Sequence, residues 1–139
     1  MSMSATDARL AAQLAALLEA ESDVVVAYLF GSRARGTPRP GSDADVAVLL
    51  TEDADLNARQ VELSATLGSE VDVVVLNRAP VALGYRVLRD GVVLVNRDER
   101  ARVRHWVRTV DHYLDSEPLR RVLADGLRKR LEEDRFGRP

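Results

Sequence analysis

The chain has 139 residues, with 20 Lys and Arg against 22 Asp and Glu, a net charge of -2 and no cysteine. This length suits one domain with a hydrophobic core, so we expect residues 1–139 to form a single domain. The balanced charge argues against direct nucleic-acid binding, and the lack of cysteine excludes disulfides, thiolate zinc sites and a cysteine nucleophile. No apolar run approaches the ~20 residues of a membrane span, so we expect a cytoplasmic protein with no membrane partner.

Hydrophobic periodicity predicts alternating helices and strands over the first part of the chain. Leucines at helical spacing predict a helix over about residues 5–20. The continuous β-branched run Val24–Phe30 is typical of a strand buried on both faces, and it ends at Gly31. Further apolar runs predict strands at 46–50, 71–76 and 92–95, joined by helices that end near Gly68 and Gly91.

From Glu99 onward the pattern is wholly helical. An apolar stripe predicts one amphipathic helix, and it contains Val103, Trp106, Val107, Val110, Tyr113 and Leu114. A break at 116–118 precedes a last helix. We therefore expect an α/β fold with a small mixed β-sheet of about four strands flanked by helices. Its core would cover about residues 5–97, followed by C-terminal helices at about 98–135.

Aspartates gather at the starts of two predicted strands. Asp43 and Asp45 are two residues apart, so their side chains share one face of an extended backbone. For an isolated Asp-x-Asp the ordinary explanation is a turn cap beside a solvated strand edge. Asp72, however, lies near the start of the next apolar run. If the two strands are neighbours, these carboxylates meet at one end of the sheet, where hard oxygen ligands suit Mg²⁺ or Mn²⁺ better than zinc.

Gly31 and Ser32 stand at the exit of the first predicted strand. A glycine there lets a phosphate approach the backbone closely, and the serine hydroxyl adds a hydrogen-bond donor. A Gly-Ser pair alone is an ordinary turn signal. Combined with the carboxylates, it indicates a site for a nucleoside triphosphate held by metal ions.

The spacing of these residues resembles a known signature. Gly31-Ser32, ten intervening residues and Asp43-Ala44-Asp45 are similar to the motif of the DNA polymerase beta-like nucleotidyltransferase superfamily. The stretches "GSRARGTPRPGSDADVAV" and "VDVVVL" resemble its small prokaryotic branch, the minimal nucleotidyltransferase (MNT) domains. The resemblance covers the chain from the first helix to the strand at 92–95 and implies a nucleotidyltransferase fold.

The resemblance also implies roles for individual residues. Asp43 and Asp45 would bind two Mg²⁺ ions, with Mn²⁺ as an alternative, and Asp72 would complete the metal site and help deprotonate the acceptor hydroxyl. The same three aspartates are the expected catalytic residues. Gly31 and Ser32 would hold the triphosphate of ATP. For Arg33 and Arg35, contact with phosphate or acceptor and a solvated basic turn stay open as alternatives.

The activity implied by this resemblance is an EC 2.7.7-type transfer of AMP from ATP onto a tyrosine hydroxyl of a cognate HEPN ribonuclease toxin. The protein would then be the antitoxin of that toxin. Two alternatives stay open: a non-catalytic antitoxin that masks its partner, and a nucleotidyltransferase acting on a small molecule such as an aminoglycoside.

Two other patterns have ordinary structural explanations. Arg100 and His105 fit the Arg-x4-6-His pattern of HEPN ribonucleases, but they lie on the amphipathic helix, and we expect His105 at its surface. Trp106 and Tyr113 belong to the apolar stripe, so we expect them in the core or an interface rather than in a base-stacking platform.

Overall fold

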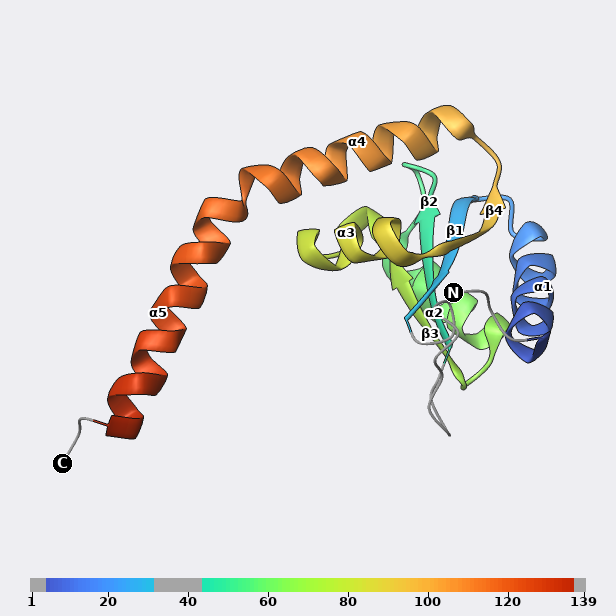
Figure 1. Ribbon diagram of the computed structural model, residues 1–139. Coiled ribbons are helices and arrows are strands. Elements are labelled where there is room, and N and C mark those ends of the chain that lie inside the picture. Colours follow the sequence, from blue (N-terminus) through green and yellow to red (C-terminus); the bar gives the residue numbers. More distant parts are fainter. Residues whose placement is uncertain (1–4, 32–43, 137–139) are drawn as a thin grey trace.

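A computed structural model describes residues 5–31 and 44–136 of the chain (Figure 1). Within them, helices and strands follow one another in the order α1 (Ala5–Glu19), β1 (Val24–Phe30), β2 (Ala44–Leu50), α2 (Leu56–Leu67), β3 (Val71–Val75), the 3₁₀ turn η1 (Leu76–Arg78), α3 (Val81–Asp90), β4 (Val92–Asn96), α4 (Glu99–Asp115) and α5 (Glu117–Phe136). The predicted α/β fold with a helical C-terminal end is confirmed.

The strands form one mixed sheet in the order β3-β2-β1-β4. β1 is antiparallel to both of its neighbours, β2 and β4, whereas β2 and β3 are parallel. Parallel neighbours need a crossover connection, and α2 supplies it. Asp55 caps the first turn of α2 by accepting a hydrogen bond from the Ala58 amide, and Gly68 ends the helix with φ 104°. As a result, the exit of β1 and the starts of β2 and β3 lie at the same edge of the sheet.

Helices cover both faces of the sheet (Figure 1). The larger core lies where α1 and α2 pack on one face, and Leu14, Leu18 and Leu63 there contact inward-facing valines of the strands. A smaller core lies on the opposite face, where Val87 of α3 packs against Val26 and Tyr28 of β1. β1 is buried on both faces, as its continuous apolar sequence predicts.

Element boundaries differ from the predicted ones by a residue or two where pairing decides them. β2 begins at Ala44 rather than at residue 46, because Asp45 pairs with Phe30 on one side and with Asp72 on the other. β3 ends at Val75, and Leu76 already belongs to the 3₁₀ turn. Polar residues at the start of a strand carry no hydrophobic signal, so periodicity places such a strand too late.

At the end of the sheet opposite Asp45, two arginine side chains link neighbouring segments of the chain by hydrogen bonds. Arg97 donates a hydrogen bond to the Val24 carbonyl at 2.8 Å and also contacts the carbonyl of Glu19 at the end of α1. Arg59 of α2 donates two hydrogen bonds to Asp23, at 2.6 and 2.9 Å, just before β1. These contacts connect α1 and α2 to the entry of β1.

The last two helices expose the apolar stripe that the sequence contains. α4 turns His105 and Thr109 toward α3 and the sheet, while the side chains of Trp106 and Val107 remain 46% and 44% exposed. The expectation that His105 lies at the helix surface is therefore wrong, since only 8% of it is exposed.

α5 extends away from the sheet (Figure 1), and its apolar side chains are also exposed. They are Leu119, Val122, Leu123, Leu127 and Leu131. None of the helices within residues 5–31 and 44–136 is both long and apolar enough to cross a membrane.

Candidate active site

The strand register places Asp45 and Asp72 side by side. Asp45 of β2 is the direct partner of Asp72 in the parallel β3, and Phe30 of β1 is its antiparallel partner on the other side. Paired residues of neighbouring strands point to the same face, at a strand spacing of about 4.8 Å. Asp45 shares its face with Ala47, which packs with Val87 of α3. The carboxylates therefore lie on the α3 side of the sheet, at its edge.

The two carboxylates differ in exposure. Asp45 is half-buried, while Asp72 is exposed, although it stands between the buried Val71 and Val73. An exposed Asp72 can contact a bound molecule without any movement of the strand. Two like charges at neighbouring positions repel each other, so this edge of the sheet favours a bound cation.

Gly31 follows β1 and contacts Asp45 directly. Its backbone has φ 80°, a left-handed conformation that favours glycine. A Cβ atom at this position would lie 2.5 Å from Oδ2 of Asp45, far inside van der Waals contact. An alanine here would therefore strain the backbone and force the Asp45 carboxylate to move.

Part of the predicted constellation lies outside the described residues. Ser32, Asp43, Arg33 and Arg35 all belong to the segment 32–43. Of the predicted site residues, the structure thus brings together Gly31, Asp45 and Asp72. The two aspartate-bearing strands, β2 and β3, are neighbours, which is the condition under which the sequence places their carboxylates together.

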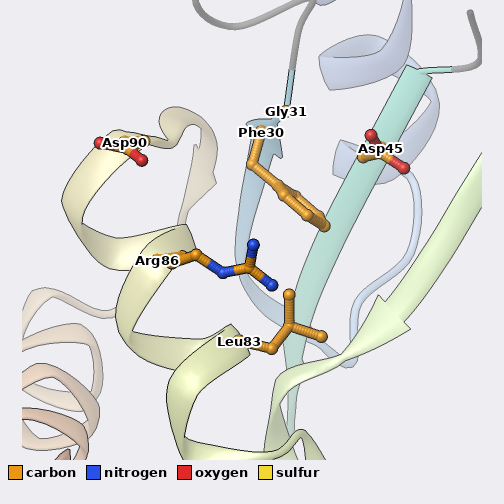
Figure 2. A pocket seen from close by; sticks show the side chains of 6 residues that line it. All are labelled: Phe30, Gly31, Asp45, Leu83, Arg86 and Asp90. Carbon is orange, nitrogen blue, oxygen red and sulfur yellow. The ribbon is translucent and has the colours of Figure 1, made fainter. Parts of the chain in front are cut away.

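A cavity of about 210 Å³ adjoins this edge of the sheet (Figure 2). Gly31, Asp45 and Phe30 line its strand side, and Leu83, Arg86 and Asp90 of α3 line the other side. Figure 2 shows the Arg86 side chain extending from α3 toward the strands, with its guanidinium between Phe30 and Leu83. Sequence reasoning missed Arg86, because one arginine on a short helix among other charged residues carries no local signal.

The residues present fit a hard divalent cation. Carboxylate oxygens are the ligands that Mg²⁺ and Mn²⁺ prefer, and the paired Asp45 and Asp72 supply them from rigid strands. Across residues 5–31 and 44–136, no group of three or more His, Cys, Asp or Glu side chains gathers closely enough to hold a metal ion. The pair would therefore need another ligand, from outside these residues or from the substrate, which is how Mg²⁺ is commonly bound beside phosphates.

Comparison with known proteins assigns the chain to a family. The model of the family "Polymerase beta, Nucleotidyltransferase" matches residues 12–100, which include the whole sheet and the candidate site. The chain belongs to this nucleotidyltransferase family. All three described site residues of this nucleotidyltransferase, Gly31, Asp45 and Asp72, lie inside the matched region. They are next to one another where β1 ends and β2 and β3 begin.

Individual relatives of this nucleotidyltransferase are similar over most of their length. The protein adenylyltransferase MntA of Shewanella oneidensis is 33% identical over 101 residues, which are 70% of this chain and 72% of MntA. A crystal structure of a toxin-antitoxin with AMP-PNP contains a chain that is 28% identical, with a TM-score of 0.71, over 86% of this chain and 96% of that one.

A second solved structure is a tri-AMPylated Shewanella oneidensis HEPN toxin in complex with an MNT antitoxin. One of its chains is 25% identical, with a TM-score of 0.70, over 87% of this chain and 98% of that one. The fold of the nucleotidyltransferase is therefore shared with chains found in toxin-antitoxin complexes.

Proposed function

We propose that the chain is a metal-dependent protein adenylyltransferase that moves AMP from ATP onto a tyrosine hydroxyl of a HEPN toxin, and so acts as its antitoxin. The observation that carries this proposal is the pairing of Asp45 with Asp72 next to Gly31. Similarity to MntA and to an antitoxin bound to a tri-AMPylated toxin supports the acceptor. We assign all of residues 1–139 to one nucleotidyltransferase domain, with the helices from about residue 98 as its C-terminal part.

Each site residue has a role in this proposal. Asp43, Asp45 and Asp72 hold Mg²⁺, with Mn²⁺ as a substitute, and Gly31 and Ser32 hold the triphosphate of ATP. When bound, Mg²⁺ supplies charge that offsets the negative charge developing on the phosphates. Asp45 orients the nucleotide from a half-buried position, and the exposed Asp72 lies where an acceptor protein can reach it.

The reaction is an in-line displacement at the α-phosphorus of ATP. The tyrosine oxygen forms a new bond to this phosphorus, and the bond from the α-phosphorus to the bridging oxygen of the β-phosphate breaks. The bonding electrons leave with pyrophosphate, and the proton of the tyrosine hydroxyl passes to Asp72 and then to water. Positioning and charge neutralisation carry most of such a transfer.

Position-specific labelling of ATP tests the type of reaction. The protein is incubated with Mg²⁺, the candidate toxin and ATP labelled either in the α-phosphate or in the γ-phosphate. We expect the α-label on the toxin and the γ-label in released pyrophosphate. A toxin that acquires the γ-label would indicate a kinase instead, and a toxin that acquires neither label would contradict any transfer to it.

Exposed apolar side chains on α4 and α5 favour a second candidate function. Trp106 of α4 is 46% exposed, and Leu123 and Leu127 of α5 are 63% and 59% exposed. Contiguous exposed apolar surface is typical of protein–protein contact sites. A chain that covers its partner with this surface would neutralise it without chemistry. Masking predicts that an Asp45→Asn variant still protects cells from the toxin, whereas the adenylyltransferase proposal predicts that protection is lost.

A further inference from the structure

Arg86 is a cation at the candidate site with no assigned role. It lies in the middle of α3 and lines the same cavity as Gly31 and Asp45. Its side chain is exposed and extends toward the strands (Figure 2). Phe30 and Leu83, which flank it, are apolar and offer it neither a hydrogen bond nor an ion pair.

The other charges of α3 leave Arg86 available to a ligand. Its neighbour Arg89 forms an ion pair with Asp90 at 2.8 Å. Arg86, in contrast, makes no hydrogen bond or ion pair with any residue in the part of the chain that the structure describes. A guanidinium that lines a cavity without a protein partner is a ready donor for an anion, and its planar fork matches phosphate oxygens.

The position of Arg86 decides which part of a substrate it can contact. In the sheet order β3-β2-β1-β4, Asp72 lies on the β3 side of Asp45, and Gly31 lies on the β1 side. α3 packs on β1, so Arg86 lies on the Gly31 side of Asp45 and away from Asp72. Because the proposed function assigns the triphosphate to Gly31 and the acceptor to Asp72, Arg86 is on the phosphate side.

We propose that Arg86 binds the β- and γ-phosphates of the nucleotide and stabilises the pyrophosphate that leaves. This inference rests on the proposed function, in which the bond between the α-phosphorus and the bridging oxygen breaks and the electron pair goes to pyrophosphate. The leaving group gains negative charge in that step, so a cation beside it lowers the barrier. Arg86 thereby adds a contact from α3 to those made by the strand edge.

Calorimetric titration of the full chain tests this contact without relying on transfer. MgATP, magnesium pyrophosphate and adenosine are titrated separately into the wild type and Arg86→Gln. We expect Arg86→Gln to weaken binding of MgATP and of pyrophosphate by about tenfold or more, and to leave adenosine binding unchanged, because a charge-assisted hydrogen bond to phosphate is lost. Arg86→Lys keeps the charge without the fork and should give an intermediate loss.

Arg9→Gln is the matched control. Arg9 is an exposed arginine of α1, which packs on the opposite face of the sheet, so this variant loses the same charge away from the cavity. Pyrophosphate binding that is equal in the wild type and Arg86→Gln would overturn the inference, as would an equal loss in Arg9→Gln. A wild type that binds MgATP but transfers no AMP would overturn the proposed function alone, since the titrations would still decide the role of Arg86.

Discussion

Gly31 and Asp45 are in such close contact that a single added carbon would separate them. A Cβ atom on Gly31 would lie 2.5 Å from Oδ2 of Asp45, and Gly31 has φ 80°. The carboxylate proposed to orient the nucleotide therefore depends on the absence of a side chain at the exit of β1. This dependence can be tested apart from the stability of the fold.

We predict that Gly31→Ala lowers AMP transfer by about a hundredfold, because displacing a reacting group by about 1 Å is enough for such a loss. The substitution also strains the backbone, at a cost of about 1 kcal/mol of the free energy of unfolding. Transfer rates at saturating ATP and urea unfolding curves measure the two effects separately.

Gly68→Ala is a matched control for backbone strain. Gly68 also has a positive φ, of 104°, but no atom lies within 4 Å of the position its Cβ would occupy. It ends α2, away from Gly31 in the sequence and outside the cavity lining. Gly68→Ala should lose stability to a similar degree and keep its transfer rate. If both variants lose transfer equally, the contact between Gly31 and Asp45 is not what matters.

Asp72→Asn removes one of two like charges that stand at paired positions of β2 and β3. Without divalent cations, we predict that the free energy of unfolding stays the same or rises slightly, because the repulsion is relieved. With Mg²⁺, the wild type should gain stability by binding the ion and Asp72→Asn should gain less. AMP transfer should fall by about a hundredfold or more, as expected for a lost general base. Thermal unfolding with and without Mg²⁺ measures the first two effects.

Asp53→Asn is the control for Asp72→Asn. Asp53 is an exposed aspartate that follows the opposite end of β2. Its substitution should change neither the stabilisation by Mg²⁺ nor the transfer rate. Mg²⁺-dependent stabilisation of Asp72→Asn equal to that of the wild type would show that Asp72 is not a metal ligand.

The side chain of Asn77 forms hydrogen bonds with the backbone of the last residue of β2, Leu50. It donates a hydrogen bond to the Leu50 carbonyl and accepts one from the Leu50 amide, both at 2.9 Å. Asn77→Ala leaves both backbone groups without this partner, so we predict a loss of about 1–3 kcal/mol in the free energy of unfolding. Transfer at low temperature should persist, because Asn77 lies at the far end of β2 from Asp45. Asn57→Ala, which removes an exposed asparagine of α2, should cost less, and an equal cost would contradict the bridging role.

His105 makes stability depend on pH. Burial lowers the pKa of His105 below its ordinary value of about 6.5, and the nearby charge of Arg108 lowers it further. Below about pH 6.5 the unfolded chain binds a proton that the folded chain does not, so the free energy of unfolding should fall as the pH falls toward the lowered pKa. His105→Gln should show a weaker decline between about pH 7.5 and 5.5. His112→Gln, at an exposed position of α4, should keep the decline of the wild type.

Local sequence signals predicted most of the fold. The β-branched run of β1 and the breaker Gly68 define element boundaries by themselves, and Asp45 and Asp72 follow from the strand pattern. Their exact pairing could not be predicted, because register depends on the α2 crossover and on contacts between strands.

The face of α4 that packs on the domain was also beyond sequence reasoning. Periodicity identifies its apolar stripe, yet the helix turns His105 and Thr109 inward and leaves Trp106 outside. Tertiary packing against α3 decides this, including the stacked rings of Tyr85 and Tyr113, whose centroids are 3.9 Å apart. An apolar stripe indicates that a helix buries a surface, but not which molecule covers it.

The central claim is that this sheet edge catalyses transfer of AMP to a toxin. The most direct measurement is the intact mass of the candidate HEPN toxin after incubation with the protein, ATP and Mg²⁺, together with the toxicity of the same sample. The wild type should add AMP and abolish toxicity, and Asp45→Asn, correctly folded, should do neither. Toxicity abolished by Asp45→Asn without any gain in mass would contradict catalysis and establish masking instead.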